Sequence, residues 1–299
     1  MWKLDGTPPI RVDAQVLTRL PDEMRKPQPS TWGRANRPGH VVDSFLEGPC
    51  FDGQGNLYVT DIPHGRIFRI DPQRGWTCVL ESDGWPNGLA LHVDGSLWIA
   101  DYRHGIQRFD PASTRLETVL GHRNSESFKG VNDLVFDAMG RLYFTDQGQT
   151  GMHDPTGRVF RWQPDGRLDL LMSNGPSPNG IAVSEDMRVL YVALTRANQV
   201  WRAPIQADGS ISKMGALQTF FGPTGPDGLA IDRFGRLLVA HPSLDGVFVL
   251  NALGEVTHHL RSPLPGSAVT NVACWPGRDA VVMTESMSGS VLVVELPPP

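Results

Sequence analysis

The stretch Leu46–Asp61, LEGPCFDGQGNLYVTD, carries the pattern from which the fold of this chain is predicted. Its end, Leu57–Thr60, is a run of apolar, aromatic and β-branched residues, and Asp52–Asn56 before it has the composition of a tight turn. The stretch therefore predicts a β-hairpin. Glu47 and Asp61 stand at the open ends of that hairpin, where a carboxylate ordinarily ends a strand in solvent.

The same layout recurs along the chain. Clear copies are NGLALHVDGSLWIAD from Asn87, NDLVFDAMGRLYFTD from Asn132 and DGLAIDRFGRLLVAH from Asp227, and weaker copies begin at Asn179 and Asn271. The units start near residues 47, 87, 132, 179, 227 and 271, a spacing of 40 to 48 residues, which is the length of a four-stranded propeller blade. Because a further strand signal follows each hairpin, we predict an all-β, six-bladed β-propeller with four-stranded blades, as a single domain over residues 1–299.

The segment before the first unit has two predicted parts. Residues 10–20, IRVDAQVLTRL, resemble a strand, whereas the sixth unit lacks room for its own outermost strand. We expect this N-terminal strand to close the sixth blade and so protect its edge. Residues 21–46 are rich in Pro and polar side chains, which indicates a capping loop over one face, anchored by Trp32.

Composition narrows the classes of function. The net charge of -5 comes from interspersed signs, so neither nucleic acid nor an anionic membrane surface is an expected partner. No apolar run approaches the ~18 residues of a membrane span, and the three cysteines form no CxxC pair. We expect a cytoplasmic protein with a small-molecule ligand, in an oligomeric state that the sequence leaves open.

Superposing the six units brings oxygen-bearing side chains into one structural position at the start of the innermost strand. They are Glu47, Asn87, Asn132, Asn179, Asp227 and Asn271. A shared turn or capping role is one explanation, since Asn-Gly and Asp-Gly are turn dipeptides. The other is a hard cation on the propeller axis, because six such positions converge in a closed ring. Oxygen ligands favour Ca²⁺, with Mg²⁺, Mn²⁺, Zn²⁺ or Fe²⁺ as alternatives.

The far ends of the same hairpins supply a second set of candidates. Asp61, Asp101, Asp146, His241 and Glu285 should return to the same mouth of the channel, and Asp146 and His241 are candidates for contact with substrate or with the first set. Loops between blades ordinarily build the pocket of such a fold. The candidates there are the pairs Tyr102-Arg103, Gln147-Gly148 and Thr195-Arg196.

Four motifs, in order, resemble the SMP-30/gluconolactonase/luciferin-regenerating family of six-bladed propellers. They are the EGP at Glu47, NDLVFD at Asn132, NGIAVSEDMRVLYVA at Asn179 and PDGLAID around Asp227. The resemblance implies a divalent metal, often calcium, held by Glu47, Asn132, Asn179 and Asp227. It also implies lactone hydrolysis, which most members perform, while some relatives cleave organophosphates. Asp227 matches the family's proposed catalytic base.

The expected chemistry has a physical basis of its own. An axial metal with an open face polarises a lactone carbonyl, and a nearby carboxylate takes the proton of the attacking water. Asp227 is the first candidate for this base and His241 the second. Alternatives are a phosphotriesterase-like hydrolase that uses the same cage, and a non-catalytic binding propeller.

One departure from the family bears on the substrate. Sugar lactonases of the family typically carry an arginine two residues before the third-blade asparagine, and Gly130 stands there in this sequence. Lys129 is displaced by one residue. Glycine offers no side-chain hydrogen bonds to sugar hydroxyls, so aliphatic and aromatic lactones stand beside sugar lactones as candidate substrates.

Overall fold

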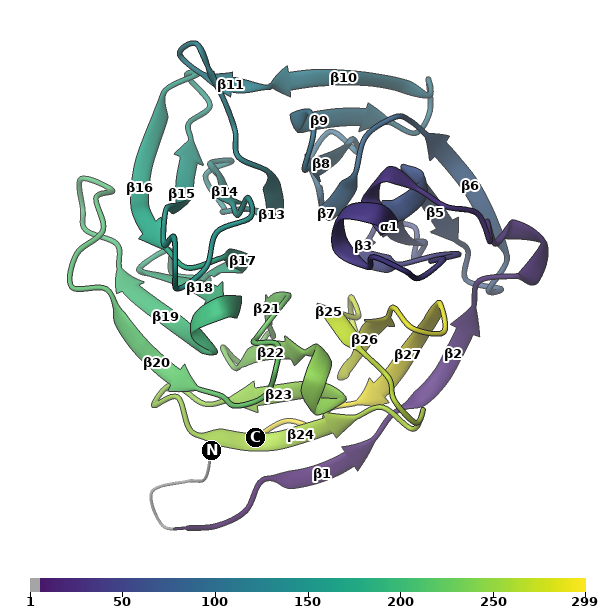
Figure 1. Ribbon diagram of the computed structural model, residues 1–299. Helices are drawn as coiled ribbons and strands as arrows, with labels where there is room; N and C mark the ends of the chain where they lie inside the picture. Colours follow the sequence, from purple (N-terminus) through teal and green to yellow (C-terminus); the bar gives the residue numbers. More distant parts are fainter. Residues whose placement is uncertain (1–5) are drawn as a thin grey trace.

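Six sheets surround a central axis in the computed structural model, which describes residues 6–299 (Figure 1). Each sheet is a blade whose first strand lies nearest the axis and whose later strands step outward. The all-β, six-bladed prediction is confirmed. Residues 1–5 of the predicted single domain lie outside the described part of the chain.

Local turn chemistry explains why the sequence folds into these hairpins. Asp52 Oδ1 accepts hydrogen bonds from the backbone N–H groups of Gln54 and Asn56, at 2.8 and 2.9 Å, and Gly55 adopts a φ of 83°. Asp137 and Asp232 make the same pair of bonds in the third and fifth blades. An aspartate that caps its own turn fixes the strand ends that it joins.

The first four blades have four strands each. The first contains β3 (Leu46–Phe51), β4 (Leu57–Asp61), β5 (Arg66–Ile70) and β6 (Trp76–Glu81), with the 3-10 helix η2 (Ile62–His64) between β4 and β5. The second contains β7 (Pro86–Leu91), β8 (Leu97–Asp101), β9 (Gly105–Asp110) and β10 (Arg115–Leu120). The third contains β13 (Val131–Phe136), β14 (Leu142–Asp146), β15 (Gly157–Trp162) and β16 (Leu168–Gly175). The fourth contains β17 (Pro178–Val183), β18 (Val189–Leu194), η3 (Thr195–Ala197), β19 (Gln199–Pro204) and β20 (Gly215–Thr219). A small hairpin of β11 (His122–Arg123) and β12 (Glu126–Ser127) joins the second blade to the third.

The last two blades take in the N-terminal segment. The fifth contains β21 (Leu229–Ile231), β22 (Leu237–His241), η4 (Pro242–Leu244), β23 (Gly246–Leu250) and β24 (Val256–Arg261), and the sixth contains β25 (Val269–Cys274), β26 (Ala280–Glu285) and β27 (Ser290–Glu295). Strand β2 (Gln15–Arg19) pairs antiparallel with β27, and β1 (Ile10–Asp13) pairs parallel with β24. The single strand predicted for residues 10–20 is therefore two strands on two blades.

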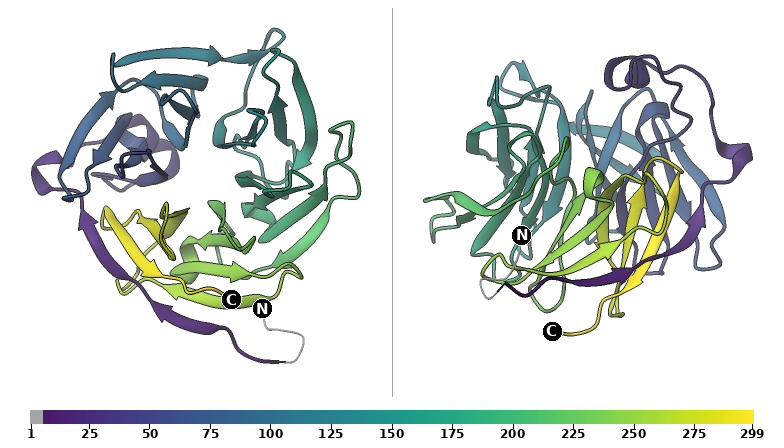
Figure 2. Two further views of the ribbon diagram at one scale, coloured as in Figure 1. Left: turned by 180° about the vertical axis from the view of Figure 1, so that it is seen from behind. Right: turned by 60° about the horizontal axis from the view of Figure 1, so that its bottom comes forward.

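Ala14 lies between these two strands. Its side chain is buried in the cluster that packs the fifth blade against the sixth, and its N–H donates to Arg261 O at 2.8 Å. This burial fixes the point at which the chain passes from one blade to the next. Figure 2 shows the same segment following the outside of the ring from both further directions.

The capping segment is ordered and partly helical. It contains η1 (Asp22–Met24) and α1 (Thr31–Asn36), whose N-cap Ser30 accepts a hydrogen bond from Gly33 N at 3.0 Å. Trp32 packs on Phe45 with ring centroids 4.9 Å apart. Helix α1 contacts η2, so the segment lies beside the first blade (Figure 1). Within residues 6–299, no helix has the length and apolar character needed to cross a membrane.

Candidate active site

Five of the six predicted column residues line one cavity of about 230 Å³. They are Glu47, Asn87, Asn132, Asn179 and Asp227. In five of the six blades the register of the innermost pair shifts at this position, as between Glu47 and Cys50 or between Val131 and Leu134. A bulge re-aims the side chain that it contains. This local irregularity therefore directs the side chains of Glu47, Asn87, Asn132 and Asn179 toward the axis, whereas Asp227 lies just before its first strand, β21.

Hydrogen bonds between neighbouring blades support the bulged backbone. Thr60 Oγ1 donates to Asn87 O at 2.9 Å, and Thr145 Oγ1 donates to Asn179 O at 2.7 Å. Thr270 Oγ1 donates to Leu46 O at 3.0 Å and so joins the sixth blade to the first. The column is thus held by contacts that run around the ring.

The sixth column position is Thr270, and the placement of Asn271 there is a correction to the sequence prediction. Thr270 lines the cavity, whereas Asn271 lies one residue further along its strand. The cause is the turn: Trp275 N bonds Ala280 O, five residues on, whereas Asp52 N bonds Asn56 O, four residues on. Asn271 still reaches the site, because its Nδ2 donates to Glu47 Oε2 at 2.8 Å.

Two carboxylates, the buried Glu47 and the half-buried Asp227, face this cavity without an ion-pair partner. Burial raises the pKa of Glu47, against the hydrogen bonds that Asn271 and Gly48 donate to it. The pKa of Asp227 is raised well above its usual value, first by burial and then by the charge of Glu47, while Asn179 and Arg196 act in the opposite direction. Among residues 6–299, no Lys, Arg or His nitrogen lies within 4.0 Å of either carboxylate. Two ionised carboxylates in such a place cost free energy unless a cation compensates their charge.

Neighbouring side chains fix the orientation of the asparagine amides. Asn132 Nδ2 donates to Gln147 Oε1 at 2.9 Å, and Gln147 Nε2 donates in turn to Ser177 Oγ at 3.0 Å. This leaves the amide oxygen of Asn132 as the atom offered to the cavity. Asn179 lies close enough to the Asp227 carboxylate to oppose the rise of its pKa.

The donor set fits a hard cation. It consists of two carboxylates, Glu47 and Asp227, and two amides, Asn132 and Asn179, which are oxygen ligands of the kind that Ca²⁺ and Mg²⁺ prefer. In the described part of the chain, no three His, Cys, Asp or Glu side chains form a metal-binding group. The site depends on its amides to complete any ligand shell.

Sequence reasoning missed a third buried carboxylate, Asp133. Its Oδ1 accepts from Leu134 N at 2.9 Å and its Oδ2 from Ile181 N at 3.1 Å, which links the third blade to the fourth. Burial raises the pKa of Asp133 to about 7, and the charge of Glu47 adds to that rise. The Asn-Asp pair inside an otherwise apolar strand was the available signal.

The second predicted set does not reach the cavity. Asp146 accepts from Gly130 N at 2.8 Å and pairs with Arg158, whose Nε lies 2.6 Å from Oδ2. His241 is fully buried against Phe220, with ring centroids 5.4 Å apart, and burial lowers its pKa to about 4. Both were predicted to return to the mouth, yet neither lines the cavity. Asp61, Asp101 and Glu285 are likewise absent from its lining.

Aromatic side chains form part of the wall. The ring centroids of Trp85 and Tyr102, from the second blade, lie 5.6 Å apart. Trp32 and Phe45 line the cavity beside the first blade. Tyr102 fills the space beside Gly130, because a Cβ built on Gly130 would collide with the tyrosine ring. Of the predicted loop residues, the lining contains Tyr102, Gln147, Thr195 and Arg196. Arg103 and Gly148 do not line it.

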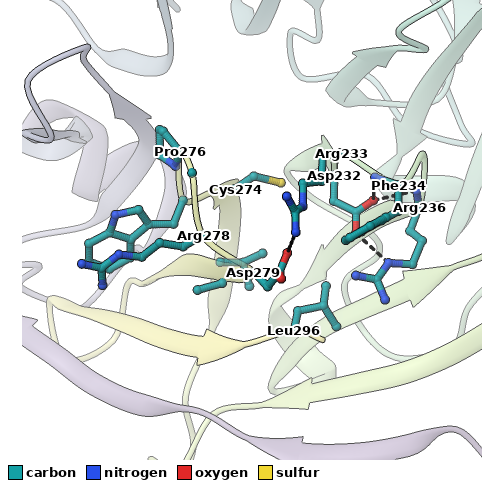
Figure 3. A pocket seen from close by; sticks show the side chains of 13 residues that line it. Asp232, Arg233, Phe234, Arg236, Cys274, Pro276, Arg278, Asp279 and Leu296 are labelled. Carbon is teal, nitrogen blue, oxygen red and sulfur yellow. Dashed lines mark hydrogen bonds and ion pairs between the residues drawn. The ribbon is translucent and has the colours of Figure 1, made fainter. Parts of the chain in front are cut away.

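A second hollow, of about 170 Å³, lies at the turns of the fifth and sixth blades (Figure 3). Four of its five charged side chains form ion pairs with one another, Arg233 with Asp279 at 2.6 Å and Arg236 with Asp232 at 2.6 Å, and the fifth, Arg278, lies over the Trp275 ring with its Cζ 4.6 Å from the centroid. Cys274, at its edge, has a pKa that burial raises to about 12. Paired carboxylates and a protonated thiol make this hollow a poor candidate for chemistry.

The fold and the cavity define a six-bladed propeller with a carboxylate- and amide-bearing axial site. The family profile described as SMP-30/Gluconolactonase/LRE-like region matches residues 45–285, and the chain belongs to this family. A gluconolactonase of Zymomonas mobilis is 30% identical over 282 residues, which cover 84% of this chain and 78% of that protein.

Solved structures show the same fold at lower identity. The gluconolactonase XC5397 of Xanthomonas campestris superposes with a TM-score of 0.75 at 23% identity, over 85% of this chain and 86% of that one. A calcium-binding regucalcin of Agrobacterium tumefaciens superposes with a TM-score of 0.75 at 18% identity, over 96% of this chain and 95% of that one.

Proposed function

We propose that this protein is a metal-dependent lactonase, a hydrolase that opens a lactone ring to the hydroxy acid. The observation that carries the proposal is a pair of carboxylates, the buried Glu47 and the half-buried Asp227, which share one cavity with two asparagine amides and form no ion pair within 4.0 Å in the described part of the chain. The Zymomonas mobilis gluconolactonase, related over most of both chains, supports a lactone as the substrate class.

A divalent cation would be held by Glu47, Asn132, Asn179 and Asp227. Ca²⁺ fits this set best, since it accepts an irregular oxygen cage, and the regucalcin of the same fold is described as calcium-binding. When bound, such an ion polarises a carbonyl and stabilises the negative charge that develops on its oxygen.

The residues of the chain then have separate tasks. Asp227 takes a proton from the water that attacks the lactone carbonyl carbon, and Asn179 holds the carboxylate of Asp227 in place. The acyl–oxygen bond breaks, and the departing alkoxide takes up the proton from Asp227. Asn271 and Gly48 hold the Glu47 carboxylate through the hydrogen bonds that they donate to it.

The test measures metal content and lactone hydrolysis on one purified sample. Activity should vanish with a chelator and return with one added ion. Asp227→Asn should lower kcat by about 10²- to 10⁴-fold, the usual contribution of a general base, with the circular dichroism spectrum unchanged. Asp165→Asn, in an exposed turn of the third blade, is the matched control and should keep full activity.

Two outcomes would replace the proposal. Faster cleavage of aryl phosphotriesters than of any lactone would favour a phosphotriesterase-like enzyme on the same cavity. Wild-type protein that is inactive on both substrate classes, whatever ion is added, would favour a binding propeller.

A further inference from the structure

Two guanidinium groups line the cavity and pair with no carboxylate. Arg196 comes from η3 of the fourth blade, and Arg37 follows α1. Neither forms an ion pair within 4.0 Å in the part of the chain that the structure describes. Arg37 lies over the Phe45 ring, with its Cζ 5.7 Å from the centroid, whereas Arg196 is exposed. Arg196 is therefore the cation that is free to turn toward a ligand.

The charges of the lining make the site attractive to an anion once a divalent ion is bound. The acidic side chains in the lining are Glu47 and Asp227, and the basic ones are Arg37 and Arg196. A divalent ion offsets the two carboxylates, which leaves the two guanidinium charges uncompensated. An Arg guanidinium recognises a carboxylate through two parallel hydrogen bonds.

A single loop positions the three surfaces that such a ligand would touch. In the loop after β14, Gln147 holds the Asn132 amide at 2.9 Å, and Gln149 Nε2 donates to Tyr102 Oη at 3.0 Å. Two residues further on, a Cβ built on Gly151 would lie 3.6 Å from Arg196 Cγ, so the arginine stem runs beside this loop. This one loop thus contacts the Asn132 amide, the aromatic wall and the side chain of Arg196.

We propose that the substrate is a lactone that carries a carboxylate group, bound with its ring against Tyr102 and its carboxylate paired with Arg196. This inference rests on the proposed function and names the substrate class for it. The aromatic wall, which fills the space beside Gly130, offers a ring face a surface to pack on. The hydroxyl of Tyr102 already accepts a hydrogen bond from Gln149, so the ring face is the part of Tyr102 that we assign to the lactone.

The test compares a matched pair of substrates, γ-butyrolactone-γ-carboxylate and the corresponding carboxamide. Wild-type enzyme should prefer the carboxylate by about tenfold or more in kcat/KM, the size of effect that one charge-assisted pair supplies. Arg196→Gln should remove most of this preference, and Arg196→Lys should retain part of it. Arg202→Gln, on the outward part of the same blade, is the charge-matched control and should keep the wild-type ratio.

A binding measurement separates recognition from catalysis. The carbocyclic analogues, in which CH₂ replaces the ring oxygen, cannot be hydrolysed as lactones, and calorimetry should show the same preference for the carboxylate. Added salt should reduce that preference, because screening weakens exposed charge pairs. Tyr102→Leu should weaken binding of both analogues by a similar factor, since it alters the ring contact and not the charge.

The outcomes distinguish this inference from the proposed function. Equal rates and affinities for carboxylate and carboxamide in the wild type, or an unchanged ratio in Arg196→Gln, would overturn the inference. Hydrolysis of δ-gluconolactone together with inactivity on both matched substrates would also overturn it while leaving the lactonase proposal intact. Inactivity on every lactone would instead refute the proposed function, and with it the substrate class inferred here.

Discussion

Replacing Asp133 by Asn removes one buried titrating carboxyl group and changes the shape of the site little. In the wild type, burial raises the pKa of this group to about 7, and both of its oxygens accept backbone N–H bonds. Asn can accept only one of these bonds, so the variant carries a cost that does not depend on pH. The informative quantity is therefore how the difference in unfolding free energy between the two proteins varies with pH.

The sign and size of this dependence follow from the raised pKa. An aspartate in the unfolded chain titrates near ~3.9, so between that pH and about 7 the folded protein holds a proton that the unfolded chain does not. The contribution of Asp133 is complete below the unfolded value and is lost as the pH rises through the folded one. Between about pH 5 and 8 the loss covers about two pKa units, or about 3 kcal/mol.

The assay is urea unfolding of both proteins in chelator at about pH 5, 6.5 and 8. We expect the advantage of the wild type over Asp133→Asn to shrink by about 3 kcal/mol across that range. His241, whose burial-lowered pKa produces the opposite trend, is present in both proteins and cancels. A difference that stays constant with pH, or that grows as the pH rises, would refute the idea that burial dominates the titration of Asp133.

Three further outcomes are expected. Gln147→Ala should weaken Ca²⁺ binding by about 10-fold or more in calorimetry, because the Asn132 amide loses its orienting partner, whereas Gln149→Ala should leave ion affinity unchanged. A free ion concentration of about 100 times the Kd of the cation site should add about 2.7 kcal/mol to the free energy of unfolding and raise Tm by about 4 °C. A Tm that no divalent ion changes would count against the site. Arg66→Ala should cost about 3–5 kcal/mol in urea unfolding, because it strips the buried Asp61 of the guanidinium that donates to it from Nε at 2.9 Å. If Asp61→Asn combined with Arg66→Ala proved no more stable than Arg66→Ala alone, the unpaired charge would not be the source of that cost.

The sequence predicted the ring and most of the column because each blade repeats one local solution. The strand–turn–strand pattern and the capped turn recur with little change, so Glu47, Asn87, Asn132, Asn179 and Asp227 could be aligned by counting. The count failed in the sixth blade. A turn with one extra residue is compatible with the same strand composition. Because an asparagine, Asn271, follows Thr270 directly, the alignment by residue type was displaced by one position.

Features that depend on contacts between blades were not predictable in the same way. The packing of Tyr102 into the space beside Gly130 joins residues of different repeats. The burial of Asp133 likewise depends on Ile181 of the next blade, and the split of residues 10–20 into two strands depends on Ala14 finding a place between two sheets. The repeat pattern of the sequence describes each blade by itself and does not specify the contacts between blades.

The pairing of β2 with β27 has a consequence for how the chain reaches its native state. Gln15 is opposite Val293, 278 residues further along the chain, so β2 leaves the ribosome long before the partner strand with which it pairs. An unpaired strand edge is prone to join the wrong chain during that interval. Charged residues interrupt the segment at Arg11, Asp13 and Arg19, and charges beside an unpaired strand are expected to oppose aggregation of the nascent chain.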